Sequence, residues 1–167
     1  MDARCAFGGD ARGLGGARVG GGRLGGARRR SAIRAGHLTV GALKRNKDKP
    51  VLFLGDTTLT GGQLAERISQ YIQAFEALGA GSGTVSGLLS LNRPEVLMIL
   101  GAGQTQGYRR TALHPLGSLD DHAYVLNDAG VTSLIIDPNP MFTERAVGLL
   151  EKVPGLKQVL TLSLIHI

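Results

Sequence analysis

Three junctions in this chain place a short apolar run directly before a helix-start pattern. They are Thr60-Gly-Gly-Gln63, Asn92-Arg-Pro-Glu95 and Ser118-Leu-Asp-Asp121. Each offers a short polar side chain at the N-cap position and an acidic or amide side chain three residues later, so that two backbone amides of the first turn are satisfied. Strands that alternate with helices predict an α/β fold with a mostly parallel sheet. Chemistry in such folds usually lies where a strand leads into a helix, and here these turns are built for capping, so none carries a phosphate-binding loop.

The positive charge of the chain is concentrated at its amino terminus. Residues 1–34 hold eight arginines against Asp2 and Asp10, which gives the net charge of +6 that the whole chain carries. Residues 35–167 hold equal numbers of basic and acidic side chains. The neutral body therefore gives no reason to expect a nucleic acid or another acidic partner.

Residues 1–34 form a low-complexity tail of Gly, Ala and Arg, and we expect them to be disordered because they offer too little apolar surface to offset the entropy of ordering. An Arg/Gly-rich nucleic-acid arm is one alternative, but Phe7 is the single aromatic residue available. An organelle-targeting segment is another, but the tail is poor in Ser and has no amphipathic period. A solvated extension is the favoured interpretation. The run Gly20 to Gly25 matches G-x-G-x-x-G formally, but no strand precedes it and no helix follows.

Cysteine content and hydropathy limit the cellular compartments in which this chain is expected. Cys5 is the single cysteine, so no disulfide and no thiolate metal site can form within one chain. No apolar stretch approaches the roughly 20 residues that span a bilayer, and the amino terminus lacks the apolar core of a secretory signal. We expect a chain without a transmembrane segment, located in the cytoplasm.

Hydrophobic periodicity predicts the order of the elements. Helices are predicted at 33–43, 61–78, 93–106, 119–129 and 141–152. Strands are predicted at 51–54, 57–59, 85–91, 108–114, 131–136 and 156–160, the first two as a hairpin around Gly55-Asp56.

The same periodicity predicts which helical residues face the core. The inward residues of three helices are expected to be Leu64, Ile68, Tyr71, Ile72, Phe75 and Leu78, then Leu119, His122, Ala123 and Leu126, then Phe142, Ala146, Leu149 and Leu150. The helix at 93–106 is apolar all round at Val96–Leu100, so it should be covered on most sides. Gly101 and Gly103 in this helix predict close packing.

Few side chains are candidates for chemistry, and each has a structural interpretation. Asp120 and Asp121 are neighbours on a helix and do not face each other, so capping is the favoured role. His122 is expected to pack on the inner face of its helix. His114 precedes Pro115 at a strand end, where a loop histidine could reach a ligand, but no nearby residue orients it.

A phosphate contact is one interpretation of Arg109-Arg110, and a solvated or edge-protecting pair is the favoured one. No His, Cys, Asp and Glu cluster has metal-ligand spacing. No nucleophile, base and orienting group can be assembled. We therefore assign no catalytic, cofactor-binding or metal residue.

Five stretches, taken in order over residues 37–161, resemble the start of the AMP-forming acyl-CoA synthetases of the adenylate-forming ligase superfamily. They are Phe53-Leu-Gly-Asp-Thr-Thr-Leu-Thr-Gly-Gly-Gln-Leu64, Leu78-Gly-Ala-Gly-Ser-Gly-Thr84, Leu91-Asn-Arg-Pro-Glu95, Leu113-His-Pro-Leu-Gly-Ser-Leu-Asp-Asp-His122, and Leu126-Asn-Asp-Ala-Gly130 with Leu134-Ile-Ile-Asp137. The fatty-acid–CoA ligase branch of actinobacterial type is the most similar. Two departures are Gly83-Thr84, where the family commonly has Gly-Asp, and Arg109-Arg110 in a strand that is usually apolar.

The resemblance implies a parent enzyme that uses ATP, Mg²⁺ and CoA to convert a fatty acid to an acyl-adenylate and then to a thioester. It also implies a Ser/Thr- and Gly-rich loop ending in Pro-Lys, whose backbone amides hold phosphates, and no such run exists here. We expect residues 35–161 to form a partial three-layer α/β/α subdomain that binds no cofactor, is inactive alone and lacks the remainder of the ligase domain. The alternative is a stand-alone α/β binding or interaction module with a closed core.

The last six residues, Leu162-Ser-Leu-Ile-His-Ile167, end without a cap, a turn or a polar tail. They also resemble the translation of a transposase adapter used in sequencing libraries. We therefore expect residues 162–167 to be a non-native end, the alternative being an ordinary apolar strand.

Overall fold

The computed structural model describes residue 36 and residues 38–162. The predicted disordered tail, Cys5 and nearly all of the predicted non-native end lie outside these residues, so those expectations stay predictions. Residues 38–45 are helical, two residues beyond the predicted end of the first helix. The following elements are β1 (Pro50–Leu54), β2 (Thr57–Thr60), α2 (Gly61–Ala77), β3 (Val85–Leu89), α3 (Pro94–Gln106), β4 (Arg109–Ala112), α4 (Leu119–Asp128), β5 (Ser133–Ile136), α5 (Pro140–Lys152) and β6 (Gln158–Thr161).

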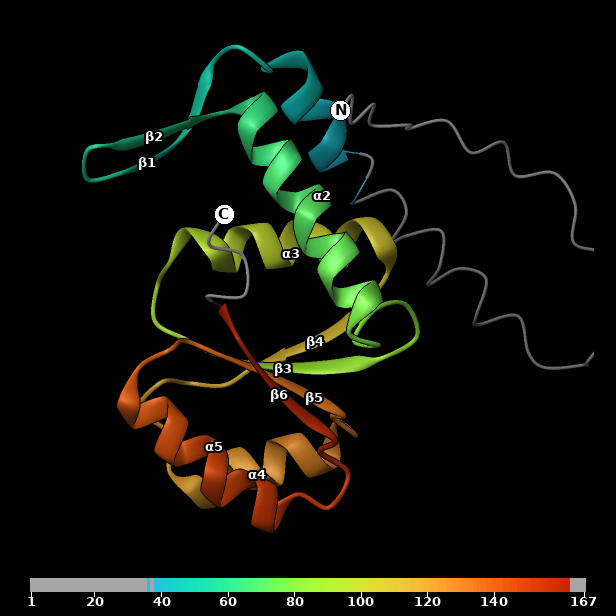
Figure 1. Ribbon diagram of the computed structural model, residues 1–167, viewed down its shortest axis with the longest axis vertical. Helices are drawn as coiled ribbons and strands as arrows, with labels where there is room; N and C mark the ends of the chain where they lie inside the picture. Colours follow the sequence, from blue (N-terminus) through green and yellow to red (C-terminus); the bar gives the residue numbers. More distant parts are fainter. Residues whose placement is uncertain (1–35, 37, 163–167) are drawn as a thin grey trace, which may run out of the picture.

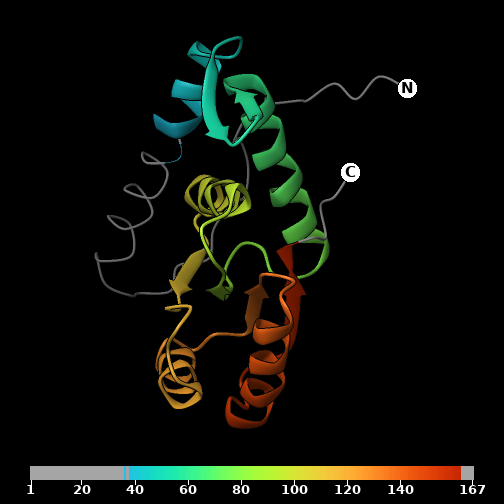
Figure 2. The same cartoon turned by 90° about the vertical axis from the view of Figure 1, so that its left-hand side faces the viewer.

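Four of the strands form one parallel sheet in the order β4-β3-β5-β6. Helices α2 and α3 cover one face, and α4 and α5 cover the other (Figures 1 and 2). The predicted three-layer α/β/α arrangement with a parallel sheet is confirmed. Strands β1 and β2 form a separate antiparallel hairpin, also as predicted, with Leu54 opposite Thr57 across the turn. In the described part of the chain, no helix has both the length and the apolar character that crossing a bilayer requires.

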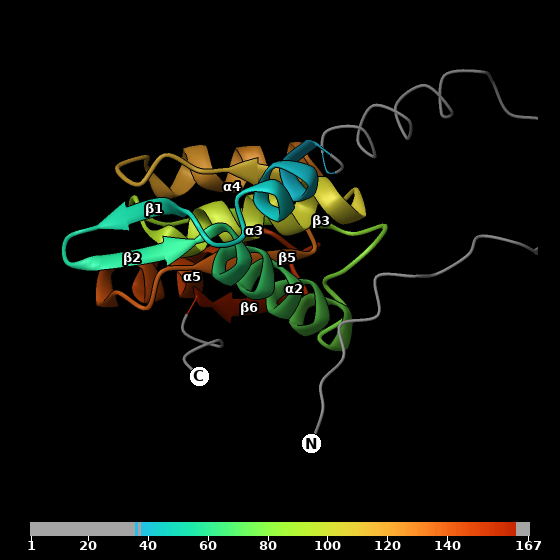
Figure 3. The same ribbon diagram turned by 90° about the horizontal axis from the view of Figure 1, so that it is seen from above.

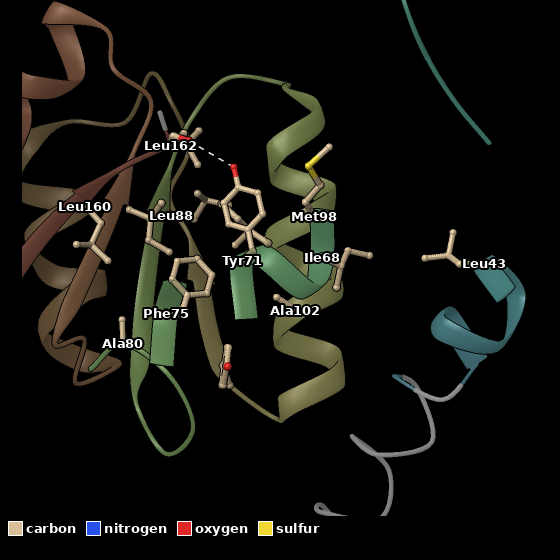
Figure 4. Packing of buried hydrophobic residues seen from close by; sticks show 13 residues of the cluster. Leu43, Ile68, Tyr71, Phe75, Ala80, Leu88, Met98, Ala102, Leu160 and Leu162 are labelled. Carbon is tan, nitrogen blue, oxygen red and sulfur yellow. Dashed lines mark hydrogen bonds between the residues drawn. The ribbon is translucent and has the colours of Figure 1, made fainter. Parts of the chain in front are cut away.

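The alternation of side chains along the strands divides the core into two clusters. Leu88 and Leu160 face α2 and α3, where they meet Phe75 (Figure 4). Ile135 of β5 and Ile99 of α3 belong to the same cluster. The intervening strand positions face the other layer and meet α4 and α5; they include Val85, Leu89, Leu134 and Ile136. Since all five residues of β3 and all four of β5 are buried, these strands need a helical layer on each side.

Helices α2 and α3 approach closely because Gly101 has no side chain. A Cβ atom at this position would lie 2.6 Å from Cδ1 of Ile68 on α2. The close packing predicted from Gly101 and Gly103 is therefore confirmed.

Two of the three predicted caps are confirmed. Thr60 accepts from the Gln63 amide, Ser118 accepts from the Asp121 amide, and in both pairs the second side chain bonds back to the N-cap amide. The third prediction is wrong, because Arg93 rather than Asn92 is the N-cap of α3 and makes no side-chain cap. Pro94 at N1 has no amide to satisfy, which reduces the need for such a cap.

The sequence analysis did not predict a fourth N-cap, which lies at the start of α5. The helix begins at Pro140, and Oδ1 of Asn139 accepts from the Met141 amide at 3.0 Å. The Asp-Pro-Asn-Pro segment, which we interpreted as a break, contains this N-cap.

Several expected core residues are exposed. Leu78 is the C-cap of α2 and Leu150 lies on the outer face of α5. On α3, Met98 and Ile99 are buried, whereas Leu97 and Leu100 are exposed. The expectation that α3 is covered on most sides is therefore wrong for the described residues, which bury one face of this helix and leave apolar side chains on the other.

Arg110 is the largest departure from the sequence analysis. Arg109 is exposed at the start of β4, but the guanidinium of Arg110 lies in the layer between the sheet and α3. Nη1 of Arg110 donates to the Ile99 carbonyl, Cζ lies 5.8 Å from the centre of the Phe75 ring, and a Cβ at Gly103 would approach Nη1 to 3.2 Å. The absent side chain of Gly103 thus makes room for the guanidinium.

The buried guanidinium of Arg110 is incompletely compensated. Its Nε and Nη2 atoms are buried without a hydrogen-bond partner among the described residues, and burial lowers the pKa of Arg110 to about 10. The side chain therefore stays charged at neutral pH, and removing a charge from water costs free energy that one carbonyl and one ring return only in part.

We expect Arg110→Met to raise the free energy of unfolding by about 1–2 kcal/mol, because an apolar side chain of similar length removes the buried charge and keeps the packing. Urea unfolding at neutral pH measures the change. Arg109→Met is the matched control and should lie within about 0.5 kcal/mol of the unchanged chain, since Arg109 is exposed. A loss of stability in Arg110→Met as large as 1 kcal/mol would show that the charge is fully compensated.

The cap of α4 supplies a pH-dependent test. Hydrogen bonds from the Ser118 hydroxyl and amide hold the pKa of Asp121 below its usual value. We expect Ser118→Ala to cost about 1 kcal/mol at neutral pH. Because a lowered carboxyl pKa stabilises the fold only while the carboxylate is ionised, the difference between variant and unchanged chain should shrink as the pH falls through that lowered pKa. Thermal unfolding at pH 7 and pH 3 measures both values, and an equal difference at the two would argue against the ionised cap.

Candidate functional site

The carboxyl ends of parallel strands are where α/β folds usually bind ligands, and here three charged side chains meet at that edge. Arg93 follows β3, and Asp137 follows β5 directly. Nη1 of Arg93 lies 2.8 Å from Oδ1 of Asp137, and its Nε and Nη2 each lie 3.2 Å from an oxygen of Glu95. The hydrogen bond with Glu95, with further support from Asp137, raises the pKa of Arg93 above its ordinary value.

These contacts make the three side chains a brace. Asp137 is 6% exposed, and its amide donates to the Leu89 carbonyl at 3.0 Å. Arg93 thereby ties the start of α3 to the ends of the two central strands. Because both carboxylates are engaged by one guanidinium, neither is placed to act as a general base.

Tyr71 reaches the same edge from α2. Its hydroxyl donates to the Leu162 carbonyl at 3.4 Å, just after the end of β6 (Figure 4). Burial, with a smaller contribution from Glu95, raises the pKa of Tyr71 to about 12. The phenol is therefore a neutral donor at physiological pH and holds the chain after β6 against α2.

His122 is buried on α4 as predicted, and both of its ring nitrogens are engaged. Nη1 of Arg145 lies 3.3 Å from Nδ1, and Nε2 lies 2.8 Å from the His114 carbonyl. Since arginine can only donate, Nδ1 accepts and Nε2 carries the proton that is donated to the carbonyl. Arg145 also donates to the Gly117 carbonyl, so the two side chains fix the loop between β4 and α4.

The remaining candidates also have structural partners. Nδ1 of His114 accepts from the Leu116 amide at 3.2 Å, so this atom closes the loop rather than pointing to a ligand. Asp121 forms the predicted cap of α4. Asp120 is paired with Lys152 on α5 and links the two helices of that layer.

A hollow of about 380 Å³ lies at the opposite edge of the sheet, where the strands begin. Arg109, Lys157, Thr84 and Ser133 are among its lining residues. Helices α2, α3 and α4 end shortly before strands that begin at this edge, and helix carboxyl ends carry partial negative charge. The partial charge of these helix ends disfavours an anion in the hollow, and the positive charges of Arg109 and Lys157 oppose that effect.

In the part of the chain that the structure describes, no group of three or more His, Cys, Asp or Glu side chains is placed to hold a metal ion. The sequence analysis missed the brace of Arg93 and Asp137, although Asp137 directly follows a predicted strand and Arg93 stands at the start of a predicted helix. Their meeting depends on β3 and β5 being neighbours, which local sequence does not reveal.

We expect Asp137→Ala to cost about 2–3 kcal/mol, because it leaves a half-buried guanidinium without one of its partners. Chemical denaturation of the variant measures this. Asp120→Ala removes a carboxylate from an exposed ion pair and is the matched control, with an expected cost below about 0.5 kcal/mol. Equal effects of the two substitutions would contradict the brace.

Comparison with known proteins places these features in a family. A sequence profile described as AMP-binding enzyme matches residues 41–165. Over 127 residues the chain is 80% identical to the medium/long-chain-fatty-acid–CoA ligase FadD8 of Mycobacterium tuberculosis (strain ATCC 25618 / H37Rv), an alignment that covers 76% of this chain and 22% of that ligase.

Solved structures agree in fold. The long-chain-fatty-acid–CoA ligase FadD1 from Archaeoglobus fulgidus has a TM-score of 0.66 at 17% identity, covering 76% of this chain and 27% of that one. The anthranilate CoA ligase AuaEII in complex with anthranoyl-AMP has a TM-score of 0.65 at 23% identity, covering 74% and 24%. The chain thus spans about a quarter of the length of these relatives. Since the profile covers most of its residues, the chain belongs to the family of AMP-binding enzymes.

Proposed function

We propose that this chain is the N-terminal part of an ATP-dependent, AMP-forming fatty-acid–CoA ligase and that it has no catalytic activity alone. The whole enzyme would activate a medium- or long-chain fatty acid as an acyl-adenylate and transfer the acyl group to CoA in the cytoplasm. The observation that carries this proposal is the 80% identity to FadD8 over a region that covers 22% of that ligase.

Lack of activity is supported by the state of the amides at three of the four strand-to-helix turns; the fourth, before α3, has no side-chain cap. A phosphate cradle needs backbone N–H groups that are free to point at the ligand. The Gln63, Asp121 and Met141 amides instead donate to the side chains of their own N-caps. The described residues therefore do not fit ATP at these turns.

The described residues also do not fit Mg²⁺, which prefers a set of carboxylate and water oxygens. Asp137 and Glu95 are held by Arg93, and no other cluster of the required size is present among residues 38–162. We propose that the rest of the ligase domain supplies the sites for ATP, Mg²⁺ and CoA, while this part supplies a scaffold.

A stand-alone α/β interaction module is the alternative, and one observation favours it. Each face of the sheet carries its own cluster of buried apolar residues, so the described residues have a core without any further segment. This alternative predicts that the chain never contributes to ligase activity.

The test is fatty-acid-dependent release of pyrophosphate from ATP. We expect no release by the chain alone. We expect activity within about tenfold of FadD8 from a chimera in which this chain replaces the region of FadD8 to which it aligns, because the same scaffold would then be present.

The positive control for this assay is unmodified FadD8. The negative control is the chain in buffer without ATP. Release by the isolated chain would contradict the proposed lack of activity. A folded but inactive chimera would contradict the ligase assignment and favour the interaction module.

A further inference from the structure

The β1–β2 hairpin presents apolar side chains to solvent. Phe53 is 68% exposed, Leu54 is 53% exposed and Val51 is also exposed. The hairpin projects beyond the sheet and the helices that cover it (Figures 1 and 3). We call Val51, Phe53 and Leu54 the hairpin apolar residues.

The hairpin makes few packing contacts with the rest of the subdomain, and its strand edges are unprotected. Leu59 packs against the cluster that contains α2 and α3, but both outer strand edges are unpaired among the described residues. Proteins usually protect such edges with charged side chains or proline inside the strand. The strands β1 and β2 contain no charged residue, and Pro50 stands at the very start of β1.

An isolated two-stranded hairpin is marginally stable in water, so an uncharged apolar one is expected to be covered. The family profile at residues 41–165 includes the whole hairpin, which makes it part of the ligase domain rather than an appendage. FadD8 extends far beyond the matched region, since the alignment covers 22% of it. The covering surface therefore has a source within the same polypeptide.

The direction of β6 agrees with a source of this kind. This strand runs toward the end of the molecule that carries α2 and the hairpin, and away from the layer of α4 and α5 (Figures 1 and 2). The Tyr71 hydroxyl holds the Leu162 carbonyl at that end. Strand β6 thus ends toward the part of the molecule that carries the hairpin.

Building on the proposed function, we propose that the β1–β2 hairpin is the docking element that joins this subdomain to the rest of the ligase domain. The surface that covers it is apolar at the positions of the hairpin apolar residues and belongs to the part of the ligase outside the shared region. A second copy of this chain is the competing occupant.

Hydrogen exchange measures the covering directly. The amides of residues 50–60 are compared in the isolated chain and in the FadD8 chimera. We expect exchange at least about tenfold slower in the chimera, because docking removes the strand edges from water. The chain alone is measured at two protein concentrations, so that self-association would be seen as slower exchange at the higher one.

Paired variants identify the side chains responsible. We expect Phe53→Ser with Leu54→Ser to return exchange in the chimera toward the rate of the isolated chain and to lower the chimera's melting temperature. The same double variant should leave the melting temperature of the isolated chain unchanged, because both side chains are exposed there. Tyr124→Ser is the matched control, since Tyr124 is 72% exposed on α4 and no part of the hairpin.

The outcomes separate this inference from the proposed function. An active chimera whose hairpin exchanges as fast as in the isolated chain would overturn the docking role and leave the ligase assignment intact. Slower exchange in the isolated chain at high concentration, abolished by the double variant, would assign the surface to a second copy and also overturn it. A chimera without activity that still protects the hairpin would support docking while contradicting the function.

Discussion

The burial of both faces of the central strands is the constraint on which the rest of this fold depends. Strands β3 and β5 have no solvent-exposed residue, so the chain must supply helices above and below the sheet. Each crossover from one parallel strand to the next provides such a helix. The short turns from strand to helix are then needed to start α3, α4 and α5, which limits what else they can do.

This constraint explains why polar side chains near the sheet edge connect one element of the subdomain to another. Arg93 joins the ends of β3 and β5 to α3, and Arg145 with His122 fixes the loop that leads into α4. Each of these groups has its hydrogen-bonding capacity directed to another part of the same subdomain. A site that transfers phosphoryl or acyl groups needs donors left free for a transition state, whereas Arg93, His122 and Arg145 are committed to structural partners.

Much of the architecture followed from sequence because its causes are local. Helical periodicity, the cap sequences at Thr60 and Ser118, and the inward position of His122 depend on residues within one or two turns of each other. The failures have two kinds of cause, the local end of a helix at Leu78 and a non-local contact at Arg110. Leu78 is exposed because α2 ends there, and Arg110 is buried because Gly103 and Phe75, which lie on other elements, leave room and a ring for it.

The same distinction applies to the candidate site. The sequence correctly identified capping at Asp121 but gave no means to pair Arg93 with a carboxylate 44 positions away. Such a pair becomes visible only when the strand order is known. The prediction that no strand-to-helix turn carries a phosphate loop rests on local sequence, because such a loop is a contiguous sequence with a mechanism of its own.

Two features of the described residues carry an uncompensated free-energy cost, and the two costs differ in kind. The Arg110 guanidinium is a charge held in an apolar layer, and the hairpin is an apolar surface held in water. No segment can dock on the unpartnered Arg110 atoms without rearrangement, because those atoms are buried, whereas the hairpin is open to a partner as it stands. A cost of the first kind belongs to the subdomain itself and persists in any longer protein. A cost of the second kind disappears when a larger domain covers the surface, so the proposed docking role concerns the hairpin rather than Arg110.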